Sequence, residues 1–411
     1  MSERYPKDYL RKLPKTDLHL HLDGSVRLST LIELARDSHV PLPAETEEGL
    51  LELVFKDNYA SLEEYLAGFG LTGKVMQNPE QLERIACELA EDNQAEGVRY
   101  IEVRFAPQLH VHPDLDTLDV LKAVARGLER AKREFNQRPE VKTGAEPPFD
   151  YGIIACAMRF FNEHFSDFYS DFLRTHAYSS RDRIHGLASY ELVKAAARAR
   201  DDLGVPVVGV DLAGPEEGYP PVDHRDAYLE AQRLFLGKTV HAGEAYGPES
   251  IYQAITELHA DRIGHGTSLL NPQAVSDPAI VNPRRYVERL GQVIASRRIT
   301  LEVCLTSNQQ TNPNYRHLED HPFGEMMDLR LSVTLCTDNR TVSRTTVTDE
   351  LHKALTTFDL GPRELKNLLV YGFKRSFFPG HYDEKRRYVR QCMEYYEKLE
   401  REQLGDPPSA R

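Results

Sequence analysis

Short apolar segments and amphipathic segments alternate along almost the whole chain. Eight runs of four to eight residues have the length and composition of buried strands, and they cover residues 16–22, 98–105, 151–158, 205–212, 238–241, 262–265, 300–305 and 332–337. Segments with a helical period lie between them, at residues 28–36, 79–96, 118–135, 189–201, 223–236, 247–258 and 286–296. This alternation requires parallel strands that are joined by helical crossovers.

Eight strand-helix units are the number that closes into a (β/α)8 barrel, the TIM barrel. An open doubly wound sheet is the alternative, but no Gly-x-Gly-x-x-Gly loop follows an early strand. A length of 411 residues suits a barrel with insertions. We therefore predict an α/β fold, a (β/α)8 TIM barrel with extra helices that cover its carboxyl-end mouth.

Two segments exceed a minimal barrel. Residues 40–75 carry apolar side chains at helical spacing, including Tyr59, Tyr65 and Phe69, which indicates either core packing or a helical lid, because the loop after the first strand lies at the catalytic rim. We expect one barrel over residues 1–400, with this lid insertion at about 40–75. Residues 401–411 are expected to be a disordered tail.

The charge balance narrows the choice of partners. The 51 basic and 64 acidic residues give a net charge of −13, which argues against nucleic acid and anionic membranes as partners. Five cysteines without Cys-x-x-Cys spacing indicate buried thiols in a reducing compartment. The first residues lack an apolar signal segment, so a cytoplasmic protein is expected. The oligomeric state is left open.

A histidine pair ends the first predicted strand. In the run from Thr16 to Gly24, His19 and His21 project from one face of the strand, and Leu18 and Leu20 project from the other. Chance alone would supply roughly 0.6 His-x-His pairs in a chain with 16 histidines among 411 residues. A metal site therefore needs further ligands from elsewhere in the chain.

Polar and titratable residues stand at the carboxyl ends of five predicted strands, where the active sites of such barrels are built. They are His19 and His21, Asp211 to Gly214, His241 to Glu244, Gly264 to Gly266, and Thr337 to Asn339. Each could by itself be an ordinary hydrogen-bonded residue. Their common position on successive strands indicates one site.

At these residues the chain resembles the adenosine deaminase family of metal-dependent hydrolases. The resemblance lies in four motifs in the family's order, Leu13–Ser25 (LPKTDLHLHLDGS), Thr239–Glu244 (TVHAGE), Arg262–Thr267 (RIGHGT) and Cys336–Asn339 (CTDN). It implies a zinc-bearing barrel that replaces the 6-amino group of a purine nucleoside by oxygen. It also implies that His19, His21, His241 and Asp338 hold one Zn²⁺ per chain, that Glu244, His265 and Asp338 are catalytic, and that His21, Asp23, Gly214 and Asn339 contact the substrate.

The chemistry is consistent with these roles. C6 of adenine is a poor electrophile, and Zn²⁺ supplies a strong nucleophile by lowering the pKa of a coordinated water to about 7. His265 can take or hold the proton of that water, and Asp338 can aim it. Glu244 can supply the proton that purine N1 accepts. The alternative for Glu244 is a cap of the helix that follows.

The substrate contacts are interpreted from residue chemistry. Gly214 either lets a ring approach the backbone N–H or serves as a turn glycine. Asn339 stands where several family members carry Asp, and its amide can donate to purine N7 without needing protonation. Asp23 can accept a ribose hydroxyl, and related adenine deaminases carry Glu at that place. Asp23 therefore favours a nucleoside over a free base.

Other motifs are interpreted as structural. His110 and His112 form a second His-x-His pair, but Pro113 follows directly and no partner is apparent. Arg104 at the end of the second strand either braces the site or pairs with a carboxylate. The signature of the other zinc deaminases, His-x-Glu with Pro-Cys-x-x-Cys, is absent.

Three functions are compared. The first is zinc-dependent hydrolytic deamination of adenosine and 2'-deoxyadenosine to inosine products with release of ammonia. The second is deamination of an adenine nucleoside modified at the 5' position, such as 6-aminodeoxyfutalosine. The third is a non-catalytic binding protein on the same barrel, which the intact set of candidate site residues disfavours. The expected partner is a small purine nucleoside, without nucleic acid or membrane.

Overall fold

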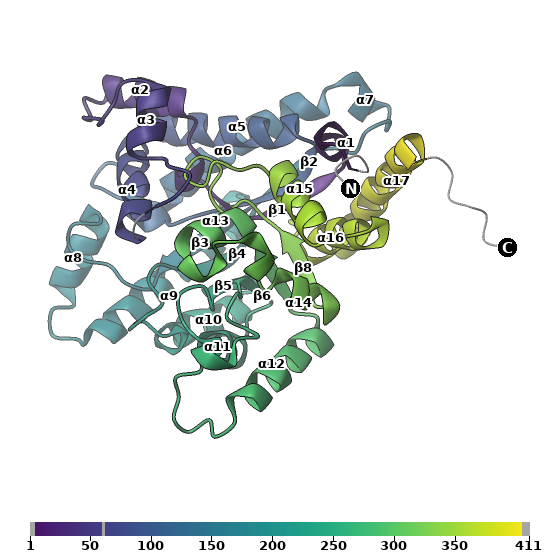
Figure 1. Cartoon of the computed structure of the whole chain (residues 1–411). Helices are drawn as coiled ribbons and strands as arrows, with labels where there is room; N and C mark the ends of the chain where they lie inside the picture. The colour runs from purple at the N-terminus through teal and green to yellow at the C-terminus, as the bar shows by residue number, and fades with distance from the viewer. Residues whose placement is uncertain (1–4, 60–61, 405–411) are drawn as a thin grey trace.

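Eight parallel strands form a single sheet in chain order, and helices surround it (Figure 1). The computed structural model describes residues 5–59 and 62–404. The strands are β1 (Lys15–His21), β2 (Val98–Phe105), β3 (Asp150–Met158), β4 (Val207–Ala213), β5 (Gly237–Ala242), β6 (Arg262–His265), β7 (Thr300–Val303) and β8 (Ser332–Leu335). Backbone hydrogen bonds of 2.8 Å between Asp338 and β1 join the two ends of the sheet. The predicted (β/α)8 barrel is confirmed.

Helices follow or precede every strand. The α-helices are α1 (Lys7–Lys12), α2 (Leu28–Asp37), α3 (Glu47–Leu53), α4 (Leu62–Thr72), α5 (Pro79–Ala95), α6 (Thr117–Asn136), α7 (Pro139–Lys142), α8 (Asp167–Thr175), α9 (Arg181–Leu203), α10 (Arg225–Arg233), α11 (Pro248–Thr256), α12 (Pro283–Arg297), α13 (Leu305–Thr311), α14 (Phe323–Asp328), α15 (Val347–Thr357), α16 (Pro362–Arg375) and α17 (Tyr382–Leu404). Short 3-10 turns are η1 (Asp23–Ser25), η2 (Gly73–Val75), η3 (Pro107–His110), η4 (Pro221–His224), η5 (Pro272–Ala274), η6 (Pro313–Tyr315) and η7 (Leu318–Asp320).

Local chemistry explains where these elements begin and end. Helix α5 starts at Pro79, whose missing N–H costs nothing in the first turn, and the Asn78 side chain accepts from the N–H of Gln81. Strand β4 starts two residues later than predicted, at Val207, because the preceding Pro206 has no N–H to donate to the sheet. The predicted seventh strand ends early, at Val303, because Leu305 already begins α13.

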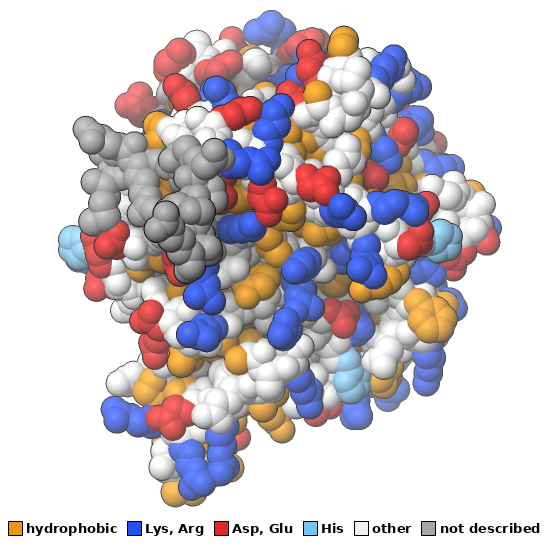
Figure 2. All heavy atoms as spheres, turned by 90° about the vertical axis from the view of Figure 1, so that its right-hand side faces the viewer, with side chains coloured by type: hydrophobic (Ala, Val, Ile, Leu, Met, Phe, Trp, Pro, Cys, Tyr) orange, Lys and Arg blue, Asp and Glu red, His pale blue; other side chains and the backbone are white. Residues whose placement is uncertain are grey.

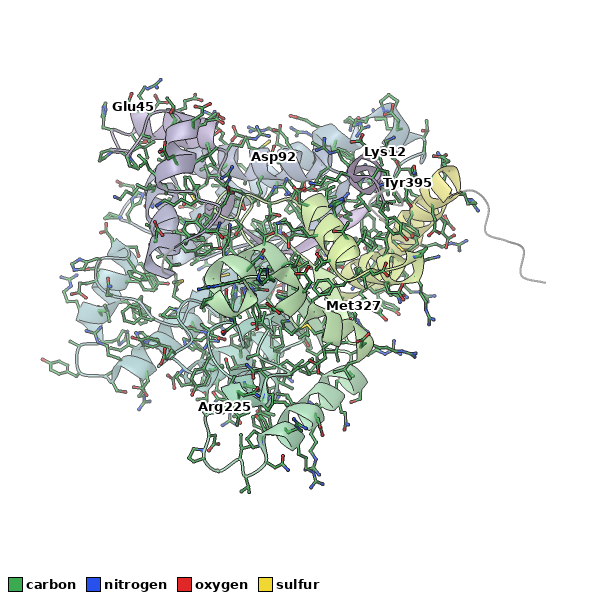
Figure 3. All side chains as sticks on the ribbon, viewed as in Figure 1. Lys12, Glu45, Asp92, Arg225, Met327 and Tyr395 are labelled. Carbon is green, nitrogen blue, oxygen red and sulfur yellow. The ribbon has the colours of Figure 1, made fainter. Side chains whose placement is uncertain are left out.

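The strands are buried on both faces, as expected for a parallel sheet covered by helices. Every residue of β1 and β2 is buried, and side chains fill the space between the sheet and the helices (Figure 3). The buried residues include charged groups inside the barrel, such as Arg104, Arg262 and Glu302. All five cysteines are free and buried, which confirms the predicted buried thiols. None of the described helices has the length and apolar character needed to cross a bilayer.

The insertion and the C-terminal helix lie at opposite ends of the barrel. Helices α2, α3 and α4 lie together at one end, and α17 lies at the opposite end (Figure 1). The insertion at residues 40–75 contains α3, α4 and η2, while residues 60–61 lie outside the described part. Helix α17 continues through Leu404, so the first four residues of the expected tail are helical, and residues 405–411 are outside the described part. Tyr388 of α17 donates to the carbonyl of Arg99 near the start of β2.

Candidate active site and metal centre

Four side chains from three parts of the barrel bring one nitrogen or oxygen atom each to a common point. His19 and His21 lie on β1, His241 lies on β5, and Asp338 follows β8. His241 Nε2 is 3.0 Å from His19 Nε2 and 3.2 Å from His21 Nε2. Asp338 Oδ1 is 3.3 Å and 3.4 Å from the same two nitrogens. Tetrahedral zinc ligands at about 2.0–2.1 Å from the ion lie about 3.3–3.4 Å apart, so the spacing fits one ion.

The second nitrogens of two rings face buried carboxylates. His19 Nδ1 is 3.1 Å from Glu302 Oε2, and His241 Nδ1 is 3.0 Å from Asp211 Oδ2. The Glu302 carboxylate accepts the Nδ1 proton of His19 and leaves the Nε2 lone pair of that ring facing the common point, and the negative charge of Asp211 beside His241 favours a proton on Nδ1 of His241 in the same way. Burial, reinforced by the charge of Arg104, lowers the pKa of His19 to about 4, so this ring is neutral at pH 7. Facing lone pairs repel each other unless a cation lies between them, and the donor set therefore fits a divalent metal.

A buried ionic network holds these carboxylates in place. Arg104 donates to Asp211 Oδ2 at 2.9 Å and to Glu302 Oε2 at 2.8 Å, and Arg262 Nε donates to Glu302 Oε1 at 2.6 Å. All four side chains are at most 1% exposed. Burial opposes ionisation of Glu302, but Arg104 and Arg262 outweigh it and hold the pKa of this carboxyl well below its usual value. Arg104 thus both pairs with carboxylates and braces the site, because those carboxylates contact His19 and His241.

Asp338 adopts a backbone conformation that is uncommon outside glycine. Its φ is 59°, in the left-handed region, and His265 at the end of β6 has a φ of 62°. Such residues cluster where the surrounding structure imposes them at functional sites. Ser307 Oγ donates to Asp338 Oδ2 at 2.5 Å, which leaves Oδ1 directed at the imidazoles. The Asp338 carboxylate is therefore oriented from both its backbone and its side chain.

The loop that carries Glu244 is held by the buried carboxylate of Glu216. Glu216 accepts from the backbone N–H groups of Gly243 at 2.8 Å, Glu244 at 3.1 Å, Ala245 at 2.9 Å and Tyr246 at 2.8 Å. Four donors in succession bind one side chain, so the conformation of the whole turn depends on it. Glu216 comes from the loop after β4, and it fixes the position of the loop after β5.

Glu244 and His265 face each other beside the four donor atoms. Glu244 Oε2 lies 3.5 Å from His265 Nε2, and Thr311 Oγ1 donates to Glu244 Oε1 at 3.2 Å. The ring centroids of His265 and His19 are 4.8 Å apart. Gly247 is the N-cap of α11, so Glu244 does not cap that helix and the alternative interpretation of this residue is wrong. The Glu244 side chain is 25% exposed, which keeps it accessible from the mouth.

A chain of directed hydrogen bonds sets the proton of His265. The N–H of Phe323 donates to His321 Nδ1 at 3.0 Å, so the neutral His321 ring carries its proton on Nε2. That nitrogen is 3.3 Å from Asn308 Oδ1, and Asn308 Nδ2 is 2.9 Å from His265 Nδ1. Burial lowers the pKa of His321 to about 3, in keeping with a neutral ring. The neutral His265 therefore carries its proton on Nε2, facing Glu244.

Two of the residues predicted to contact substrate, Asp23 and Asn339, carry buried polar atoms without a partner in the described part of the chain. Asp23 is partly buried, with 15% of its side chain exposed, and its buried Oδ1 has no hydrogen-bond partner among the described residues and lies 3.9 Å from His21 Nδ1. Burial raises the pKa of Asp23 to about 6. Asn339 Nδ2 donates to Tyr65 Oη at 2.8 Å, while its Oδ1 lacks a partner in the described part. Gly214 has a φ of 103°, a conformation that favours glycine.

Comparison with known proteins places the chain in a family. Residues 14–395 match the family model described as adenosine deaminase. Adenosine deaminase 1 of Streptomyces coelicolor is 35% identical over 390 residues, which cover 94% of this chain and 87% of the relative. Adenosine deaminase of Mycobacteroides abscessus is 34% identical over 382 residues, 92% of this chain and 93% of the relative. The chain belongs to the adenosine deaminase family.

A solved structure agrees with this assignment. An Arabidopsis N6-mAMP deaminase superposes on this deaminase with a TM-score of 0.71 at 25% sequence identity, and the alignment covers 94% of this chain and 99% of that chain. Together with the donor cluster at the carboxyl ends of the strands, the family identifies the chain as a hydrolytic, metal-dependent deaminase.

Several residues that build the site of this deaminase were not identified from the sequence. Glu302, Glu216, Asn308 and Tyr65 all contact a predicted site residue or its loop. A signal exists only for Glu302, because a charged residue within a fully apolar strand must find a buried partner. Glu216 and Asn308 stand in a loop and a helix where polar residues are common, and Tyr65 is predicted only as a core or lid residue of the insertion.

The second His-x-His pair stays outside the site. In the described part of the chain, the cluster of possible metal donors joins His19, His241, His265 and Asp338, and it contains neither His110 nor His112. His21 lies beside this cluster, with its Nε2 3.2 Å from His241 Nε2. His110 is buried, and burial lowers its pKa to about 4. The interpretation of His110 as structural agrees with this environment.

Proposed function

We propose that the chain is a zinc-dependent adenosine deaminase, which hydrolyses adenosine and 2'-deoxyadenosine to inosine and 2'-deoxyinosine and releases ammonia. One observation carries the proposal: three imidazole nitrogens and one carboxylate oxygen meet beside a Glu–His pair in a member of the adenosine deaminase family. One such donor cluster in the described part supports one Zn²⁺ per chain.

His19, His21, His241 and Asp338 would hold the zinc. Bound there, the ion supplies water activation at neutral pH. Glu302 and Asp211 keep the protons of His19 and His241 on Nδ1, so that Nε2 is free to coordinate. The carboxylates thus prepare the donor set before the ion arrives.

The proton transfers are assigned to Glu244 and His265. A protonated Glu244 carboxyl donates its proton to purine N1 as C6 becomes tetrahedral. The resulting carboxylate then takes a proton from the attacking water and passes it to the departing amino group, which leaves as ammonia. His265 carries its proton on Nε2, so it serves as a hydrogen-bond donor that holds the attacking oxygen. The balance is one adenosine and one water consumed, with one inosine and one ammonia formed.

Substrate contacts follow from the unsatisfied atoms. Asp23 offers a buried carboxyl oxygen to a ribose hydroxyl. Asn339 Nδ2 donates one N–H to Tyr65 and has a second for purine N7, whereas its unpartnered Oδ1 can only accept. Helix α4 brings Tyr65 to Asn339, and Tyr65 is only 5% exposed. This contact supports the lid interpretation of the insertion, in which α4 covers the purine and excludes water.

An ultraviolet absorbance assay tests the proposal. Zinc-loaded protein is incubated with adenosine, 2'-deoxyadenosine, N6-methyl-AMP and a 5'-modified adenine nucleoside, and chelator-treated protein is the control. We expect conversion of adenosine and 2'-deoxyadenosine, loss of turnover with chelator, and recovery when Zn²⁺ is added back. Conversion of the 5'-modified nucleoside alone would favour the second function. No turnover of any of the four by zinc-loaded protein contradicts the proposal.

A further inference from the structure

A cavity lies at the other end of the barrel from the proposed active site. It has a volume of about 410 Å³ and is walled by the turn before β6 (residues 259–261), the end of α12 (residues 297–299) and the residues that end and follow α16 (374–377). These segments adjoin the amino ends of β6 and β7. Figure 2 views the side of the molecule that carries α17 and shows Lys and Arg side chains gathered across the middle of this face.

The cavity wall carries four cations without acidic partners. Arg297, Arg298, Lys374 and Arg375 all line it, and within residues 5–59 and 62–404 none of them forms an ion pair. Asp261 is the one acidic residue of the lining, and Lys238 already holds it, with Nζ at 3.0 Å and the backbone N–H at 2.9 Å.

These four unpaired cations line one cavity. With a net charge of −13, acidic partners are abundant, so four neighbouring cations without one mark a local positive field. Mutual repulsion of the four charges destabilises the empty cavity, and an anion relieves it. Two of the four are guanidinium groups at the end of α12, and guanidinium binds phosphate oxygens through two parallel hydrogen bonds.

The charge of Arg262, at the floor of the cavity, is already neutralised by buried partners. Arg262 is 1% exposed, stacks at 3.7 Å over the ring of Phe377, and donates to Glu302 at 2.6 Å and to the Arg375 carbonyl at 3.0 Å. It also pairs with Glu102. The Arg262 charge is therefore used inside the barrel, and the free positive charge belongs to the wall.

We propose that this cavity binds a polyphosphate anion, the phosphate chain of a nucleoside triphosphate or of inorganic polyphosphate. Several linked phosphates match several unpaired cations, whereas a single carboxylate would leave most of them unpaired. The volume lies in the range of small-molecule pockets. A long nucleic acid needs an extended basic stripe and would meet the net negative charge of the rest of the surface. The site is separate from the donor cluster at the carboxyl ends.

Calorimetric titration of the zinc-loaded full chain tests the proposal, with tripolyphosphate and GTP as probes. The variant Arg297→Gln/Arg298→Gln removes two wall charges. The matched control Arg285→Gln/Arg289→Gln removes the same charge from exposed positions of the same helix, outside the cavity. We expect one saturable site, at least about tenfold weaker binding in the wall variant, and an unchanged constant in the control. Tighter binding of GTP identifies a nucleotide source, and equal or tighter binding of tripolyphosphate identifies the inorganic one.

Three results would overturn the assignment. The first is the absence of saturable binding of either probe at moderate salt. The second is an equal loss of affinity in the wall variant and the control, because that would reduce the effect to net charge. The third is displacement of tripolyphosphate by a single-stranded oligonucleotide that binds more tightly, because that would identify a nucleic-acid surface. Circular dichroism of both variants, which alter only exposed side chains, verifies that they are folded.

Discussion

Glu302→Gln tests whether the buried ionic network beneath the proposed metal site supports both the fold and metal binding. Gln keeps the size of the side chain and removes its charge. The change leaves two buried guanidinium groups, Arg104 and Arg262, to share the remaining carboxylates Asp211 and Glu102. It also replaces the full carboxylate that accepts from His19 Nδ1 by an amide, which faces four donors at once: His19, Arg104, Thr239 and Arg262.

The magnitude of the effect can be worked from these contacts. Removing one partner of a buried ion pair costs about 3 to 5 kcal/mol of unfolding free energy. An unfolding entropy of about 2.1 cal/mol/K per residue over 411 residues converts 1 kcal/mol into a shift of about 1.2 °C. We therefore expect the Tm of the metal-free variant to fall by about 4 to 6 °C. Loss of the partner of a metal-binding imidazole lowers metal affinity by about 10- to 100-fold.

Two measurements check this expectation. Differential scanning calorimetry of the metal-free proteins gives the Tm, and competition with a chromogenic chelator gives the zinc affinity. Glu288→Gln, an exposed change of the same chemistry on α12, is the control and should leave both quantities unaltered. A Glu302→Gln protein with the Tm and zinc affinity of the control would refute the reasoning that the Glu302 carboxylate stabilises the fold and supports metal binding.

Further predictions concern catalysis, metal content and pH. Glu244→Gln should keep its zinc, measured by atomic absorption, and lose about 10²- to 10⁴-fold in kcat, whereas equal loss of zinc would mean a structural role. His19→Ala should lose zinc and activity together, and a variant that retains both would refute the ligand assignment. Glu216→Ala removes the acceptor of four backbone N–H groups, so kcat should fall about 10- to 100-fold with zinc retained. The control is Glu217→Ala, an exposed change beside it. A wild-type rate in Glu216→Ala would show that the loop after β5 keeps its conformation without this carboxylate. The pKa of Glu302 in the fold lies below its usual 4.5, so the stability that its ionised carboxylate adds to the fold is complete above pH 4.5 and is lost as the pH falls. The Tm difference between wild type and Glu302→Gln should therefore shrink below about pH 4.5. A constant Tm difference down to about pH 3 would contradict this direction.

The barrel was predictable because its signal is local and repeated. Alternation of apolar runs with helical segments is a property of neighbouring residues, and eight repeats leave few ways of burying all the apolar faces. The strands at 98–105 and 262–265 agree with the structure at both ends. The errors at the ends of β4 and β7 come from single residues, the missing N–H of Pro206 and the early start of α13.

The candidate site was predictable to the extent that the fold brings strand ends together. His19, His241 and Asp338 are more than 90 positions apart from one another, and they meet because carboxyl ends of parallel strands share one rim. Once the barrel is inferred, the polar residue that follows each strand can be assigned to that rim without further information.

The partners of those residues depend on packing in three dimensions. Whether Glu302 meets His19 and Arg262, or Glu216 meets the turn after β5, depends on the stagger of neighbouring strands and on how each loop folds back. The residues around Glu216 carry no periodic pattern that reports this. Hydrophobic spacing along a chain specifies the backbone path, whereas the orientation of an imidazole or the acceptor of an orphan N–H is decided by atoms that are distant in the chain and meet only after it has folded.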